Sequence, residues 1–259
     1  MTKESHMEFI KRVFKLDPDL LPPDDFVVRK HLIVDIETSG LDKNEDIVIC
    51  GGLLDYEKKF AYVYFLPDPQ DWKKFRRFLR NTIQWYIGRG YTAWAYNADF
   101  ERSFLMIKEI RDLMMYRVVM RIEYDYEYEE EYELPDYRFS KMTITATDII
   151  RTYYPKFYLG DNNNGEVKKL ESFLKSLFKD YVASEKIPDI YFKKWLLKRD
   201  KSAIDTIVHH NFADLYLEAW ILWYISQVVR TIIKSLEDYA LKKFGYLPTE
   251  IIEYLRDYV

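Results

Sequence analysis

An apolar segment that carries two acidic side chains, HLIVDIETSG at residues 31–40, constrains the fold more than any other part of the sequence. Its β-branched run ends at Thr-Ser-Gly, which predicts a buried strand over His31–Ile36. Side chains two positions apart on a strand point to the same side of a sheet. Asp35 and Glu37 are therefore expected on one face, with the intervening apolar residues on the other.

Two adjacent carboxylates are costly in a protein interior unless something compensates their charge. A bound cation is one such compensation, and a site made only of oxygen ligands favours Mg²⁺ or Mn²⁺ over zinc. The alternative is that Asp35 and Glu37 are surface acids at a solvated strand end. The strand by itself leaves both interpretations open.

A second acidic segment, AYNADFERSFL, predicts a strand over Tyr91–Tyr96 followed by a helix over Ala98–Met115. Glu101 falls in the first turn of that helix, and Asp99 is the competing acidic residue. Acids in a first turn are also favoured by the positive end of the helix dipole, so neither needs a ligand to explain it.

A third segment, VHHNFADLYLEAW, places Asp214 at the start of a long apolar helix expected over Asp214–Phe244. His209 and His210 lie just before it. An imidazole titrates near neutral pH and can accept a proton from a metal-bound water, although a single histidine is more often structural.

Taken in order, DIETSGL, NADFERSFL and HHNFAD resemble the three motifs of the DEDD superfamily of 3′–5′ exonucleases, which have a ribonuclease H-like fold. The similarity also includes TATDIIRTYYP around Asp148 and VKKLESFLKSLF, so that it extends from about Lys30 to Ile225. The exonuclease domains of family B polymerases are the branch that the chain resembles most. The resemblance implies an α/β protein, with a ribonuclease H-like mixed sheet flanked by helices.

The resemblance also implies two Mg²⁺ or Mn²⁺ ions, and it assigns them the four acidic ligands Asp35, Glu37, Glu101 and Asp214. Glu101 departs from the family, which has aspartate at this position. One branch of the family has a histidine as general base, and His209 occupies that position in this chain. Another branch has a tyrosine, and His210 occupies that position. His210-Asn211 is similar to the Tyr-Asn of the nearer branch, which favours His210.

The rest of the pattern predicts three regions: an N-terminal arm at 1–30, a ribonuclease H-like exonuclease domain at 31–233 and a C-terminal helical extension at 234–259. The alternating aromatic and acidic residues within 116–140 predict an inserted β-hairpin. This hairpin could dock a protein partner, steer a nucleic-acid strand by repulsion, or be a solvated hairpin without a binding role. The other expected elements are a helix in the arm at Glu8–Phe14, strands at Ile47–Leu54 and Phe60–Leu66, and a helix at Asp71–Ile87.

Composition bounds the function. The net charge of −4 argues against a protein that coats duplex nucleic acid, but not against a nuclease whose bound metals reverse the local sign. Two basic segments are candidates for guiding a nucleic-acid strand: Lys73 to Arg77, which also fits the wet face of a helix, and Arg151 to Lys156, where tyrosines suit base stacking.

A single cysteine, Cys50, excludes an internal disulfide, and the first thirty residues contain no apolar run typical of a secretory signal. We therefore expect a cytoplasmic enzyme without a membrane span. The expected substrate is single-stranded nucleic acid, DNA favoured, or a frayed 3′ end. The alternatives are an RNA-directed or structure-selective nuclease on the same fold, and a catalytically weak relative that binds nucleic acid or protein.

Overall fold

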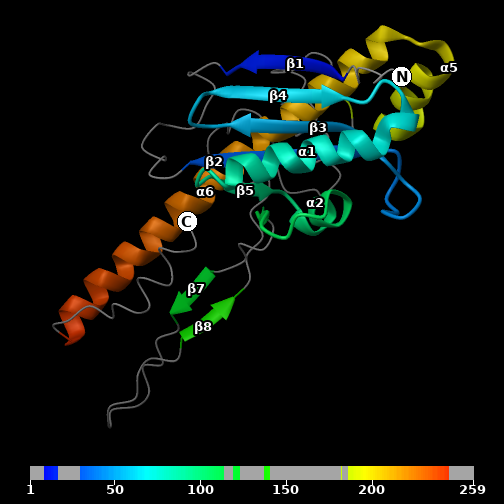
Figure 1. The fold of residues 1–259 in the computed structure, drawn as a ribbon. Helices are drawn as coiled ribbons and strands as arrows, with labels where there is room; N and C mark the ends of the chain where they lie inside the picture. The colour runs from blue at the N-terminus through cyan, green and yellow to red at the C-terminus, as the bar shows by residue number, and fades with distance from the viewer. Residues whose placement is uncertain are drawn as a thin grey trace, which may run out of the picture.

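The structure is a computed structural model, which describes residues 9–16, 30–113, 119–122, 137–140, 182 and 186–244. Its centre is β2 (His31–Thr38), which lies in a six-stranded mixed sheet of order β1-β4-β3-β2-β5-β6 (Figure 1). The other strands are β1 (Ile10–Lys15), β3 (Val48–Asp55), β4 (Phe60–Phe65), β5 (Thr92–Ala95) and β6 (Arg111–Asp112).

The sheet has an antiparallel half and a parallel half. The strands β1, β4, β3 and β2 pair antiparallel in that order, whereas β5 and β6 add to β2 in parallel. Helices flank this open sheet, so the expected α/β class with a mixed sheet flanked by helices is confirmed.

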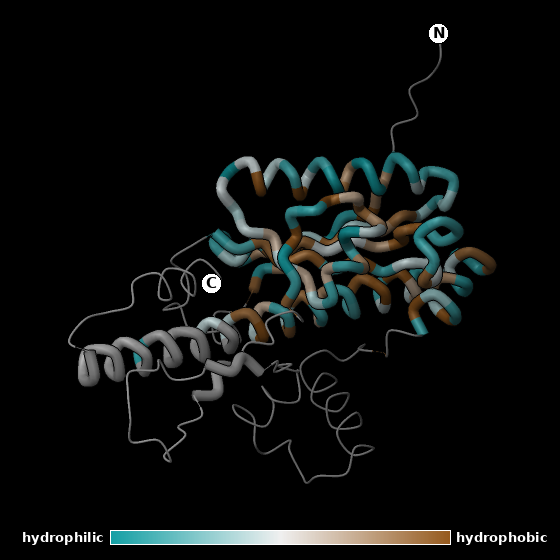
Figure 2. The backbone as a smooth tube through the Cα atoms, turned by 90° about the horizontal axis from the view of Figure 1, so that it is seen from below, coloured by the Kyte–Doolittle hydropathy of each residue, from teal (hydrophilic) through white to brown (hydrophobic). Residues whose placement is uncertain are grey.

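Helices cover both faces of the sheet, and each face has its own apolar cluster (Figure 2). On one face, α1 (Trp72–Ile87) and α2 (Ala98–Leu105) bury Phe75, Leu79 and Phe104 together with Val34 and Ile36 of β2. On the other face, the long helix α6 (Lys201–Phe244) crosses β2, β3 and β4. The short helices η3 (Pro69–Asp71), η5 (Ile187–Phe192) and α5 (Lys193–Lys198) complete the elements that connect these layers.

Residues 10–15 form a strand, so the helix predicted at Glu8–Phe14 is wrong. Ile10 and Phe14 pack against the α6-side cluster while the residues between them are mostly exposed. An apolar spacing of four suits one face of a helix and equally one face of a strand. Pairing with β4 along its whole length decided between the two.

Two predicted helix boundaries are also corrected. The helix expected over Ala98–Met115 ends at Leu105, because Met106 adopts a left-handed conformation with φ of 59° and the chain turns towards β6. Helix α6 begins at Lys201, well before Asp214. The side chain of Asp200 accepts a hydrogen bond from the Ser202 N–H at 2.9 Å and caps this earlier start.

Several predictions fall outside the described residues: Asp148, the segment VKKLESFLKSLF, the Arg151 to Lys156 stretch and the acidic run Tyr124–Glu133. Within the expected insertion, β7 (Val119–Ile122) and β8 (Tyr137–Ser140) pair antiparallel as a hairpin requires. The division at residues 30 and 233 stays a prediction, although α6 continues without a break across residue 233. Among the described helices, none combines the length and the apolar character that a membrane crossing requires.

Candidate metal centre

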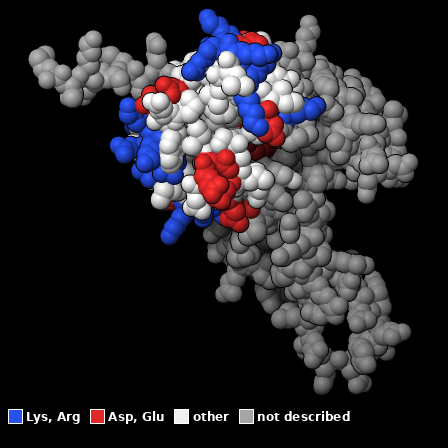
Figure 3. All heavy atoms as spheres, turned by 90° about the vertical axis from the view of Figure 1, so that its right-hand side faces the viewer, with Lys and Arg blue, Asp and Glu red and all other residues white. Residues whose placement is uncertain are grey.

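Asp35, Glu37 and Glu101 come together because β2 and β5 run parallel and end at the same edge of the sheet. Asp35 and Glu37 lie near the end of β2, and α2, which carries Glu101, begins three residues after β5. The carboxyl ends of parallel strands are a common position for polar sites in α/β proteins. Figure 3 looks onto this edge, where Lys and Arg side chains lie on either side of a group of Asp and Glu side chains.

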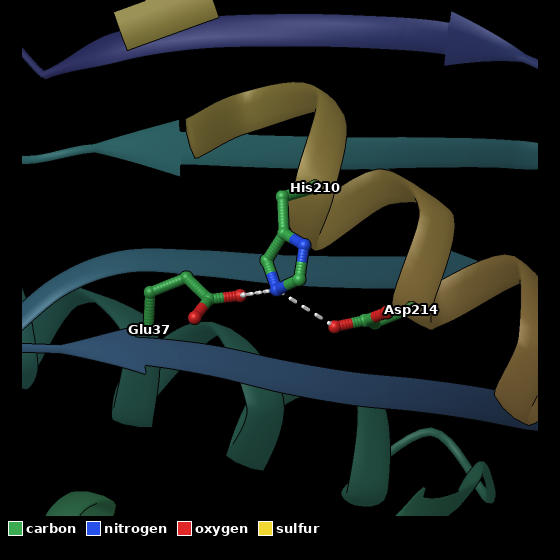
Figure 4. A group of neighbouring side chains, drawn as sticks. All are labelled: Glu37, His210 and Asp214. Carbon is green, nitrogen blue, oxygen red and sulfur yellow. Dashed lines mark ion pairs between the residues drawn. The ribbon is translucent and has the colours of Figure 1, made fainter. Parts of the chain in front are cut away.

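Helix α6 brings His210 and Asp214 to this edge, one helical turn apart (Figure 4). His210 Nε2 lies 3.1 Å from Asp214 Oδ2 and 3.6 Å from Glu37 Oε1. One ligand atom of each of these three residues lies within 4.8 Å of the other two, a spacing that one metal ion can bridge. His210 is completely buried, so this contact is shielded from water.

The buried imidazole acts as the counter-charge of its acidic neighbours. Burial opposes protonation of His210, but the negative charges of Asp214 and Glu37 and hydrogen bonds to Asp214 and the Val182 backbone outweigh it and raise the pKa of His210 to about 9. His210 is therefore an imidazolium at neutral pH when only protein groups surround it. A cation bound between the same carboxylates would favour the neutral imidazole instead.

Asp35 is held in place from α6 by Asn211. The Asn211 amide donates hydrogen bonds to the Asp35 side chain at 2.6 Å and to its backbone carbonyl at 3.2 Å. Gly52 lies opposite Asp35 in the β2 and β3 pairing, and a Cβ there would collide with Asn211 Oδ1 and Leu215. The missing side chain of Gly52 is what lets Asn211 reach Asp35.

Of the two acids in α2, only Glu101 points inward. Glu101 as a residue is 3% exposed, whereas the Asp99 side chain is 80% exposed and pairs with Arg102 at 2.9 Å. Glu101 Oε2 is buried and has no hydrogen-bond partner among the described residues. The geometry therefore selects Glu101 over Asp99 as a candidate ligand.

The two histidines face different parts of the molecule. His210 contacts the carboxylates. The His209 ring instead lies 5.8 Å from the ring of Phe14 in β1, the outermost strand of the sheet. Residues adjacent on a helix point about 100° apart, which separates their surroundings. His210 is therefore the histidine that the structure brings to the carboxylates.

Three carboxyl groups of this centre, those of Asp35, Glu37 and Glu101, resist ionisation while protein alone surrounds them. Desolvation by burial, and then the charges of neighbouring acids, raise the pKa of Asp35, and burial and then Asp112 and Glu37 raise the pKa of Glu101 to about 8. Burial also raises the pKa of Glu37, in spite of His210. Divalent cations with a preference for oxygen ligands are the groups that such a cluster of hard donors fits.

Two residues near this centre were not expected from sequence as candidates. Glu218 is 5% exposed and lies one turn after Asp214 on α6, and Asp112 of β6 is 8% exposed and interacts electrostatically with Glu101. A glutamate four residues after Asp214 in an otherwise apolar helix is the sequence signal that could have indicated the first. In the expected basic segment of α1, Lys73 and Arg76 lie over the Trp72 ring.

The family comparison agrees with this architecture. A family model described as RNase_H superfamily matches residues 32–222, the stretch that runs from the beginning of β2 to α6 beyond Glu218. No curated protein is similar enough to the chain to count as a match. The superfamily generally includes nucleases, and these nucleases generally use divalent metals. From the matched residues and the fold together, the chain belongs to the RNase_H superfamily.

Proposed function

We propose that the protein is a metal-dependent 3′–5′ exonuclease that hydrolyses phosphodiester bonds of single-stranded DNA or frayed 3′ ends. The observation that carries this proposal is the convergence of four acids, Asp35, Glu37, Glu101 and Asp214, with His210 at one edge of the sheet. The order of these residues along the chain is that of the DEDD exonuclease motifs.

The four acids are the groups that would hold Mg²⁺ or Mn²⁺, and the unpartnered Oε2 of Glu101 is a buried acceptor suited to a cation. Bound divalent ions would activate water and stabilise the oxygen that leaves. Asn211 orients Asp35 through two hydrogen bonds, so that this carboxylate is positioned before substrate arrives.

His210 is the proposed proton acceptor. Its Nε2 lies between Glu37 and Asp214, so that a water held by the acidic cluster falls within reach of this nitrogen. Its hydrogen bond to the Val182 backbone restrains the orientation of the ring. His209, beside Phe14, has no proposed part in the chemistry.

A degradation assay tests this proposal. Wild type, Asp35→Asn and the exposed control Asp99→Asn are incubated with 5′-labelled single-stranded and duplex DNA and RNA, in Mn²⁺, Mg²⁺ or chelator. We expect a metal-dependent ladder that shortens from the 3′ end of single-stranded DNA, absent in Asp35→Asn and unchanged in Asp99→Asn.

The other outcomes separate the alternatives. Internal cuts would replace the exonuclease by an endonuclease, and a ladder confined to RNA would replace the DNA preference by an RNA preference. No cleavage of any of these substrates by wild type would contradict the nuclease assignment. Mn²⁺ binding without cleavage would then favour the catalytically weak relative.

A further inference from the structure

Glu218 is a buried acid that the four-acid centre leaves without a role. It follows Asp214 by one turn on α6 and is 5% exposed, between the buried residues Leu217 and Ala219. A glutamate almost never occupies such a position unless its carboxylate is paired, hydrogen-bonded or bound to a metal. Its neighbours therefore decide what it does.

The carboxylate of Glu218 is fixed where α6 meets the end of β5. The backbone N–H of Tyr96, the residue after β5, donates a hydrogen bond to it. Its Oε2 is buried and has no hydrogen-bond partner among the described residues, and the same holds for Glu101 Oε2. One oxygen of Glu218 is thus anchored and the other is free to bind a ligand.

The free oxygen belongs to the acidic cluster of the metal centre. Glu218 interacts electrostatically with Glu101, Asp214 and Glu37, and its charge also acts on Asp35. His210 lies two turns earlier on α6 and forms its contacts with Glu37 and Asp214. Glu218 therefore adds a further buried carboxylate to the acidic cluster, and Glu101 is the acid whose charge acts on it most strongly.

Protein cations do not compensate Glu218 in the part of the chain that the structure describes. Arg102 is occupied by Asp99 and by the Ile110 carbonyl. Arg111 stacks over the Trp94 ring at 5.5 Å. The charges that act on Glu218 are those of other acids, Glu101, Asp214 and Glu37.

We propose that Glu218 is a fifth carboxylate ligand of the metal centre and that it binds one divalent cation together with Glu101. The proposal rests on the proposed metal-dependent function, but adds a ligand that the four-acid motif does not contain. Two buried carboxylates, each with an unpartnered oxygen, form an oxygen-only site for Mg²⁺ or Mn²⁺. Anchoring by Tyr96 pre-organises one of them.

Direct measurement of Mn²⁺ binding tests the proposal. Electron paramagnetic resonance counts bound Mn²⁺ per chain, and calorimetry gives the affinities, for wild type and Glu218→Gln. Glutamine keeps an acceptor for the Tyr96 N–H and nearly the same volume, but removes the charge. We expect one of the Mn²⁺ sites to weaken by about tenfold or more. Glu109→Gln, the same change at an exposed position near α2, is the matched control and should bind as wild type does.

Glu218→Asp gives a second readout if Glu218→Gln does not fold. It keeps the charge but retracts the carboxylate by one methylene, so Mn²⁺ affinity should again fall while circular dichroism stays unchanged. Unchanged Mn²⁺ count and affinities in a folded Glu218 variant would overturn the proposal and leave a structural glutamate. Absence of Mn²⁺ binding in wild type would overturn the metal centre as well. Binding that depends on Glu218, without cleavage of any nucleic acid, would leave this proposal standing and remove only the nuclease function.

Discussion

The two sides of the metal centre differ in how their negative charge is compensated. On the side of His210, Glu37 and Asp214 lie 3.6 Å and 3.1 Å from the His210 imidazole, which is a positively charged imidazolium at neutral pH. On the side of Glu101 and Glu218, each carboxylate has a buried oxygen without a hydrogen-bond partner among the described residues. Glu37 and Asp214 have a protein cation, His210, beside them. Glu101 and Glu218 need protonation or a bound metal ion to compensate their charge.

This difference indicates how the site is balanced before metal binds. The histidine lets two of the acids stay close together in a buried place, because its charge offsets theirs. On the Glu101 side, the charge of Arg102 lowers the pKa of Glu101, but burial and then the charges of Asp112 and Glu37 outweigh it and raise this pKa to about 8. Loss of an acid and loss of the histidine should therefore have opposite effects on the stability of the chelator-treated protein.

The largest expected effect is that of Glu101→Gln. We expect the proposed nuclease activity to fall on the order of 10³-fold, because a proposed metal ligand is lost. At pH 8 in chelator, however, the variant should unfold at a higher temperature than wild type, since a neutral amide replaces a carboxylate that burial disfavours. Thermal unfolding and the degradation assay measure the two effects, with Glu109→Gln as the exposed control. A lower unfolding temperature would contradict the inference that the buried Glu101 carboxylate destabilises the metal-free protein.

His210→Gln should remove the positive charge that compensates Glu37 and Asp214. Activity should fall on the order of 10²-fold if the imidazole accepts the proton. Stability in chelator at pH 7 should also fall, because Glu37 and Asp214 lose their counter-charge. His209→Gln changes the adjacent residue, whose ring lies near Phe14, and tests whether the loss is specific to His210. Equal losses of activity in both variants would reject His210 as the specific base.

The pH dependence of stability should sharpen the comparison. The pKa of Glu101 rises from 4.5 to about 8 and that of His210 from 6.5 to about 9, so the folded chain binds more protons than the unfolded chain between these values. The free energy of unfolding in chelator should therefore be highest near pH 5 and fall by about 2 kcal/mol or more by pH 9. Saturating Mn²⁺ should flatten this decrease, because metal binds the ionised carboxylates. Urea denaturation at several pH values measures it, and stability that rises with pH in chelator would contradict the prediction.

The smallest expected effect concerns Asn211 and Gly52, which together position Asp35. Gly52→Ala inserts a Cβ where Asn211 Oδ1 and Leu215 lie, so the free energy of unfolding should fall by about 1–3 kcal/mol. Activity should fall with it, because Asn211 no longer holds Asp35. Gly88→Ala is the control: its Cβ would lie 3.3 Å from the Gln84 carbonyl oxygen, after the end of α1 and before the beginning of β5. Wild-type stability and activity in Gly52→Ala would exclude this support.

Local patterns in the sequence predicted the elements that carry the site. The apolar run around Asp35 predicted β2, and the segment AYNADFERSFL predicted a strand followed by a helix whose first turn contains Glu101. These predictions succeeded because strand and helix periods depend on nearby residues. The helix at Glu8–Phe14 failed because the same apolar spacing fits an edge strand, and only pairing with β4 selects it.

The sequence by itself determined which residue types could form a metal centre and the strand and helix periods that orient them. The tertiary structure decided which of these side chains meet. The crossing of α6 over β2 brings Asn211 to Asp35 across 176 residues, selects His210 over His209 and adds Glu218 to the acids. The physical reason is that burial, electrostatic coupling and contact between distant segments depend on packing of the whole sheet, which no local pattern contains.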